Sequence, residues 1–115
     1  MEKTSEVHNI PPLYDKNSRV LILGSFPSVK SRKAAFFYAH PQNRFWPTLA
    51  TLFGEETPKT VEEKRSLALR HGVALWDTIG SCEIVGSSDA SITNVVPNDL
   101  RVILDAADIQ AVFCN

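Results

Sequence analysis

The chain has few cysteines and no long apolar segment. Cys82 and Cys114 are its two cysteines, and they do not form a CxxC pair. A zinc or iron–sulfur site with four cysteine ligands therefore cannot be built from this chain alone. No apolar run approaches the roughly 20 residues that span a bilayer, and residues 1–6 lack the apolar core of a signal peptide. We therefore expect a cytoplasmic protein with no membrane partner.

The chain also lacks an excess of basic residues. Its 12 Lys and Arg residues and 13 Asp and Glu residues give a formal net charge of -1. Proteins that bind nucleic acids are usually basic, so the overall charge argues mildly against such a partner. Basic residues do gather locally, at Lys30, Arg32, Lys33 and Arg44. Taken alone, such a segment is more simply explained as an ordinary solvated loop.

Apolar runs and helical stripes predict one α/β domain. With 43% apolar residues, the chain can bury the core of a single domain. Residues 1–18 are polar and are predicted to be an N-terminal lead-in, and residues 19–115 form the domain. Continuous apolar runs are typical of strands buried in a parallel sheet. They lie at residues 20–23 and 73–76, and residues 109–114 are predicted to be a third strand.

Capping residues predict where the helices lie between these strands. Apolar residues at helical spacing begin near Phe45 and stop at Gly54. Thr60 opens a capping box whose helix runs to His71, with Gly72 as its C-terminal cap. Asn98 is predicted to cap a helix over residues 99–107. In that helix the inward-facing residues are expected to be Leu100, Ile103 and Leu104.

The remaining segments are expected to be loops. Residues 25–41 contain two prolines, show no clear period and are predicted to include one helical turn near residues 31–36. Residues 77–97 are predicted to be rich in loops. The order strand, helix, helix, strand, helix, strand indicates an α/β fold with a parallel sheet. The chain stops directly after a predicted core strand, and we expect it to be truncated at its C-terminus.

Two segments combine the residue types that bind a flat ring. Gly24-Ser25-Phe26-Pro27-Ser28 follows the first strand, at the edge where open α/β sheets bind ligands, but it is not a P-loop. In residues 38–46, Tyr38 offers a ring for stacking, and Asn43 offers a donor and an acceptor to a base edge. Core packing for the aromatic residues and helix capping for Asn43 remain open alternatives.

These segments resemble the uracil-DNA glycosylase superfamily. Residues 38–46 are similar to a segment of the mismatch-specific uracil-DNA and thymine-DNA glycosylases. Together with residues 21–28, Trp76-Asp77 and Ser81-Cys82-Glu83, they resemble the hypoxanthine-DNA (deoxyinosine) glycosylase branch. The resemblance implies a three-layer α/β/α sandwich around a parallel sheet, with the last strand absent from this chain. It also implies a monofunctional hydrolase that flips a deaminated base from DNA and leaves an abasic site, with no metal or organic cofactor.

The resemblance also implies roles for individual residues. Phe26 differs from much of the superfamily, where an Asp or Asn at that position orients the attacking water, so Asn43 is expected to carry more of the catalysis. Asp89 lies in another stretch similar to the family, although loop capping explains it more simply. The catalytic assignments are Asn43 and Ser25. The base-binding assignments are Gly24, Phe26, Pro27, Tyr38, Ala39 and Asn43, and the DNA-backbone assignments are Ser28, Lys30, His40 and Arg44.

Other functions are compatible with the same residues. Hypoxanthine is the favoured base, with uracil and mismatched thymine as alternatives. A non-catalytic module that binds damaged DNA would keep the stacking site, and a flavodoxin-like nucleotide binder or hydrolase would use the first loop for phosphate. Because a second active-site motif is expected beyond residue 115, this chain is also expected to be weak or inactive as a fragment of the enzyme. A monomer is expected.

Overall fold

A parallel sheet forms the centre of the protein. The computed structural model describes residues 4–7, 10–24, 31, 36–39, 43–84 and 91–115. In this part of the chain, the sheet has the strand order β3-β2-β6. β2 (Val20–Gly24) lies between β3 (Val73–Asp77) and β6 (Ala111–Cys114), and it pairs in parallel with both. The predicted parallel sheet and α/β fold are confirmed.

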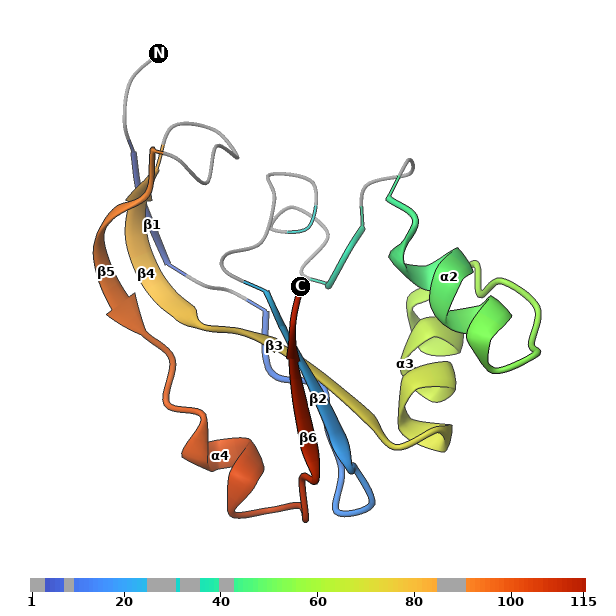
Figure 1. The fold of residues 1–115 in the computed structure, drawn as a ribbon. Coiled ribbons are helices and arrows are strands. Elements are labelled where there is room, and N and C mark those ends of the chain that lie inside the picture. The colour runs from blue at the N-terminus through green and yellow to red at the C-terminus, as the bar shows by residue number, and fades with distance from the viewer. Residues whose placement is uncertain (1–3, 8–9, 25–30, 32–35, 40–42, 85–90) are drawn as a thin grey trace.

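Helices lie on both sides of this sheet. In Figure 1, α2 (Phe45–Leu52) and α3 (Val61–Arg70) lie on one side of the sheet, and the short α4 (Arg101–Leu104) lies on the other. A cluster of apolar side chains forms the core between these layers. Its buried residues are Ile10, Leu13, Leu21, Leu23, Phe36, Phe37, Trp46, Leu49, Ala50, Leu67, Ala68, Val73, Ala74, Leu75, Trp76 and Ile103.

Local signals fix the ends of α2 and α3. Gly54 has a φ of 66°, and the N–H groups of Gly54 and Glu55 donate to the carbonyls of Thr51 and Ala50. This is the Schellman arrangement that ends many helices. The side chain of Thr60 accepts a hydrogen bond from the N–H of Glu63 and caps α3. The predicted stop at Gly54 and the predicted cap at Thr60 are both confirmed.

A second, antiparallel sheet occupies segments that were predicted to lack regular structure. β1 (Thr4–Val7), β4 (Ile79–Ile84) and β5 (Thr93–Pro97) pair in the order β1-β4-β5. The prediction of a loop-rich stretch over residues 77–97 is therefore wrong for β4 and β5. The predicted lead-in also contributes to the fold, because β1 pairs with β4 and Leu13 forms a bridge with Leu75.

The predicted helix over residues 99–107 is shorter than expected. α4 begins after Leu100, which occupies the N-cap position, and it ends at Leu104. The side-chain amide of Asn98 instead donates to the carbonyls of Asp77 and Ile79, at 2.9 and 3.2 Å. Asn98 thus stabilises the turn between β3 and β4. Ile103 is buried as predicted, whereas 47% of Leu104 is exposed.

Two further expectations concern a helical turn near residues 31–36 and membrane-spanning segments. The helical turn expected near residues 31–36 lies largely outside them, although the N–H of Phe36 donates to the carbonyl of Ser31 at 3.2 Å. Within the described ranges, no helix is long and apolar enough to cross a membrane.

The cap at Thr60 gives a direct test of how α3 is stabilised. We expect Thr60→Ala to lower the free energy of unfolding by about 1 kcal/mol, because the N–H of Glu63 loses its acceptor. Urea denaturation measures this change. Thr57→Ala, at an exposed position in the preceding loop, is the matched control and should change stability much less. Equal effects of the two substitutions would contradict a capping role for Thr60.

Candidate functional site

The carboxyl ends of the parallel strands meet at one edge of the central sheet. The register places Gly24 of β2 opposite Asp77 of β3, and Leu23 opposite Cys114 of β6. The N–H of Asn115 continues the pairing of β6 by donating to the carbonyl of Leu23 at 2.7 Å. Ligands of open α/β sheets bind at this edge, and polar side chains gather here.

Gly24 leaves room for a buried carboxyl group. Asp77 is only 5% exposed. A Cβ atom at Gly24 would lie 2.4 Å from Asp77 Oδ1, far inside van der Waals contact. The same Cβ position is 3.8 Å from the hydroxyl of Tyr38. The missing side chain of Gly24 therefore allows Asp77 to approach the end of β2, while Tyr38 lies at ordinary contact distance from the same position.

Tyr38 is held in an unusual conformation beside this edge. Its φ of 53° is rare for a residue with a side chain. Its ring stacks on the ring of Phe45, with centroids 4.0 Å apart and an interplanar angle of 17°. The hydroxyl oxygen accepts a hydrogen bond from Asn115 Nδ2 at 3.1 Å. The ring therefore has one covered face and a fixed tip.

The hydroxyl of Tyr38 is kept neutral. Burial raises the pKa of Tyr38 above its ordinary value. The hydrogen bond from Asn115 lowers the pKa in part, and the negative charge of Asp77 raises it further. With a raised pKa, the hydroxyl stays protonated at neutral pH and can act as both donor and acceptor.

A hollow beside Phe45 is lined by Asn43. It has a volume of about 440 Å³. Asn43 Oδ1 accepts a hydrogen bond from the N–H of Phe45 at 2.8 Å, which fixes the orientation of the amide and leaves Nδ2 as a donor. The other lining residues are Ile22, Arg44, Phe45, Thr48, Leu49, Leu52 and Asn115. The hollow thus combines apolar walls with amide groups and one guanidinium, a lining that suits a planar polar ligand.

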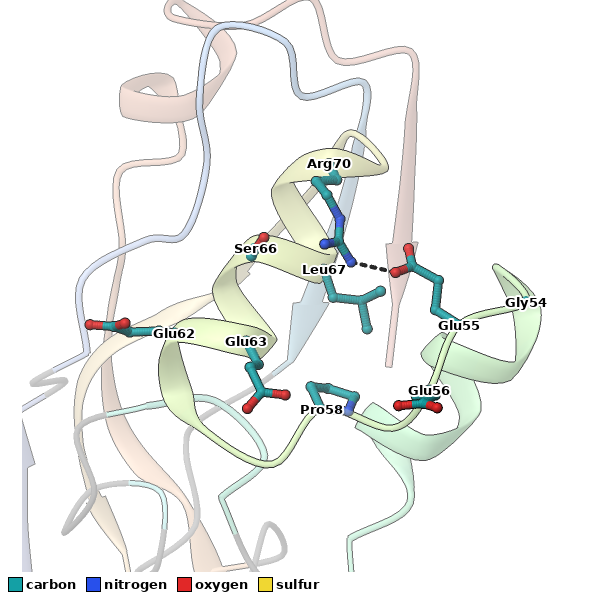
Figure 2. Close-up of a pocket in the computed structure, with 9 residues that line it drawn as sticks. All are labelled: Gly54, Glu55, Glu56, Pro58, Glu62, Glu63, Ser66, Leu67 and Arg70. Atoms are coloured by element: carbon teal, nitrogen blue, oxygen red, sulfur yellow. Dashed lines mark hydrogen bonds and ion pairs between the residues drawn. The ribbon is translucent and has the colours of Figure 1, made fainter.

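A second hollow has the opposite character. It has a volume of about 620 Å³ and lies between α3 and the loop that follows α2 (Figure 2). Glu55 binds the guanidinium of Arg70 across it, and the same carboxylate contacts His71. Its lining consists of Gly54, Glu55, Glu56, Pro58, Glu62, Glu63, Ser66, Leu67 and Arg70. This acidic lining disfavours a phosphate-bearing ligand, so the sheet edge is the better candidate site.

Comparison with known proteins shows the family of the chain. No protein-family model matches the chain. A curated protein of Methanosarcina barkeri, named hypoxanthine DNA glycosylase, is 34% identical over 107 residues, which cover 91% of this chain and 68% of that protein. The chain belongs to the hypoxanthine branch of the uracil-DNA glycosylase superfamily. This confirms the resemblance found in the sequence.

Two further relatives of this branch are similar over most of the chain. A Methanosarcina acetivorans protein, also named hypoxanthine DNA glycosylase, is 34% identical over 105 residues, which cover 90% of this chain and 66% of the relative. The solution NMR structure of a candidate uracil DNA glycosylase from Methanosarcina acetivorans matches with a TM-score of 0.73 and 29% identity. That match covers 85% of this chain and 63% of the solved chain. The chain thus spans about two thirds of each relative.

The described residues bring together part of the site that the sequence predicted. Gly24 and Tyr38 lie together at the sheet edge, and Asn43 and Arg44 line the hollow beside it. The backbone N–H of Ala39 donates to the hydroxyl of Ser31 at 3.1 Å, so it is already engaged. The other predicted residues lie outside the described part of the chain. They are Ser25, Phe26, Pro27, Ser28, Lys30 and His40, together with Asp89.

Asp77 and Asn115 received no role from the sequence, yet both lie at this edge. Asp77 stood in a motif similar to the hypoxanthine branch, and Asn115 followed the last predicted strand. Their position at or directly after the ends of parallel strands was the available signal, because such residues share one edge of the sheet. Among the described residues, no cluster of three or more His, Cys, Asp or Glu side chains could hold a metal ion.

The close approach of Gly24 and Asp77 can be tested by a double-mutant cycle. We expect Gly24→Ala to lower the free energy of unfolding by about 1–3 kcal/mol, because its Cβ would overlap the short, buried side chain of Asp77. The cost should be smaller in an Asp77→Ala background, where the overlapping oxygen is absent. Urea denaturation of the two single variants, the double variant and the parent measures both costs. Equal costs in the two backgrounds would refute this contact.

The acidic hollow gives a prediction about pH. The hydrogen bond from His71, assisted by Arg70, lowers the pKa of Glu55 below its ordinary value. The ionised carboxylate therefore stabilises the fold above the ordinary glutamate pKa of about 4.3. This stabilisation is lost as the pH falls through the lower pKa of the folded state.

We therefore expect the parent to be more stable than Glu55→Gln near neutral pH, with a difference that shrinks and disappears in acid. Urea denaturation from about pH 7 to about pH 3 measures the difference. Glu56→Gln removes one charge from the same loop and leaves the Glu55 contacts intact, so it should show a smaller difference. A Glu55→Gln effect that does not vary with pH would rule out this linkage.

Proposed function

We propose that this protein removes hypoxanthine from DNA by flipping the base out of the helix and hydrolysing its N-glycosidic bond, which leaves an abasic site. The observation that carries the proposal is the 34% identity to two proteins named hypoxanthine DNA glycosylase, over 91% and 90% of this chain. DNA that contains a deaminated base is the proposed partner. Enzymes that process a base take it out of the stack, because their target atoms are out of reach inside the duplex.

The described site supports this reaction through its amide donors. When the glycosidic bond breaks, negative charge develops on the departing base, and donors aimed at that base lower the barrier. Asn43 Nδ2 is such a donor, since Oδ1 is occupied by the N–H of Phe45. The amide is therefore oriented before any ligand arrives. We assign the contact with the base to Asn43.

The aromatic pair supports the binding of a flat base. Phe45 covers one face of the Tyr38 ring, so only the opposite face of that ring can receive a base. Stacking of a base on an aromatic side chain contributes roughly 1–3 kcal/mol. Because the hydroxyl of Tyr38 stays neutral, it places no additional negative charge beside the departing base. Arg44, in the wall of the same hollow, supports a contact with the DNA backbone.

In this proposal Asn43 accepts from the N–H of Phe45 through Oδ1 and donates to the base through Nδ2. Two substitutions separate these roles. Asn43→Asp keeps an oxygen that can accept from the N–H of Phe45 but removes the amide donor. We expect single-turnover release of hypoxanthine from an oligonucleotide to fall by about 10²–10³-fold in this variant, the typical loss for one such donor. Thermal stability should change little. Asn43→Ala should also lose base release, and its free energy of unfolding should fall by about 1 kcal/mol, because the N–H of Phe45 loses its acceptor.

The experiment includes three controls. Asn17→Ala, at an exposed residue before β2, should release base at the parental rate. Oligonucleotides with uracil or a G·T mismatch test the choice of base. The Methanosarcina barkeri relative serves as the positive control. If that relative releases hypoxanthine while this chain binds the same DNA and releases none, this chain acts as a damage-binding module or an inactive fragment, and the proposal fails for it.

A further inference from the structure

Asn115 joins two parts of the site that are far apart in the sequence. Its backbone N–H is bound to the carbonyl of Leu23, at 2.7 Å, so its Cα position is set by the central sheet. Its side-chain amide donates to the hydroxyl of Tyr38 at 3.1 Å. Asn115 also lines the same hollow as Asn43. The rigid sheet is thus connected directly to the tip of the Tyr38 ring.

Each part of Tyr38 is held by a different contact. On one side of Tyr38, the indole N–H of Trp46 donates to the carbonyl of Phe37 at 3.0 Å. On the other side, the N–H of Ala39 donates to the hydroxyl of Ser31. Phe45 covers one face of the ring, and Asn115 binds its hydroxyl. The backbone, the face and the tip of this residue are therefore all restrained.

These restraints matter because the backbone of Tyr38 is unfavourable by itself. A residue with a side chain at positive φ costs on the order of 1–3 kcal/mol, and it persists only where surrounding contacts maintain it. Such conformations gather at functional sites, where they aim a side chain in advance. A ring aimed in advance loses less conformational freedom when a ligand stacks on it.

We propose that Asn115 is a positioning residue, which holds the ring of Tyr38 in the plane on which the flipped base stacks. This inference rests on the proposed function, because it concerns the same base site. Asn115 acts through the hydroxyl of Tyr38 and not by touching the base. Removing the amide of Asn115 or the hydroxyl of Tyr38 should therefore have the same consequence for base release.

A double-mutant cycle tests this equivalence. We expect Asn115→Ala and Tyr38→Phe each to reduce the single-turnover rate of hypoxanthine release by about 2–10-fold, as for the loss of one neutral hydrogen bond. The double variant should be no slower than either single variant, because both substitutions remove the same contact. If Asn115 contacts the DNA directly, the two reductions multiply, and this result would overturn the proposal. Cys114→Ala, at the exposed neighbouring position, is the matched control and should leave the rate unchanged.

A second measurement does not depend on activity. The chain has two tyrosines, Tyr14 and Tyr38, so a Tyr14→Phe background isolates the ultraviolet absorbance of the Tyr38 phenolate. Because the amide of Asn115 favours the phenolate, Asn115→Ala should raise the pKa of Tyr38. Cys114→Ala should leave it unchanged. An unchanged pKa in Asn115→Ala would overturn the inference, whatever the rates of base release.

The two measurements together separate the two possible failures. A raised pKa combined with equal, non-multiplying reductions in base release supports the positioning role. A raised pKa in a chain that releases no base, while the Methanosarcina barkeri relative does, overturns the proposed function for this chain and the positioning role with it. An unchanged pKa in an active chain overturns the positioning role and leaves the proposed function standing.

Discussion

The parallel pairing of β2 with β3 and β6 is the constraint on which the site depends. Its register sets Gly24 opposite Asp77 and Leu23 opposite Cys114. Side chains from distant parts of the sequence therefore meet at one edge without any direct local signal. A shift of one residue in either pairing would turn these side chains to the other face of the sheet. The buried Leu21 and Leu23 oppose such a shift, because it would expose them to water.

Elements with local signals could be predicted from the sequence, and elements that depend on distant partners could not. α2 and α3 follow from an apolar stripe, the cap at Thr60 and the glycine after each helix, all of which act within a few residues. β1 and β5 carry no such signal. The sequence of β5, Thr-Asn-Val-Val-Pro, shows no alternation of apolar and polar residues, and every residue of this strand is exposed. Its stability comes from pairing with β4, and the same pairing makes β1 a strand in a segment that appeared too polar for one.

The residues of the site also divide into those that a local sequence signal indicates and those that depend on distant partners. Helix capping and base recognition were alternatives for Asn43 in the sequence. In the structure Arg44 occupies the N-cap position of α2, and Asn43 Oδ1 accepts from the N–H of Phe45 two residues on, which leaves Nδ2 as a donor. Tyr38 was chosen for its ring, but its stacking on Phe45 and its positive φ follow from packing that no local pattern encodes. Asp77 and Asn115 gain their meaning only from the sheet register. Their residue types alone fit a turn or a helix cap equally well.

The overall charge of the chain does not conflict with a DNA substrate. A net charge of -1 argued mildly against such a partner, but the charges are separated along α2. Arg44 and Asn43 precede this helix, whereas the acidic hollow begins with Gly54 and Glu55 beyond its C-terminus. An α-helix of 8 residues is about 12 Å long, at about 1.5 Å per residue. Screening at physiological ionic strength acts over about 8 Å, so the glutamates beyond α2 only weakly repel a phosphate bound near its first turn. For the proposed DNA substrate, the field at this site is therefore set by the residues around the sheet edge and not by the sum over the chain.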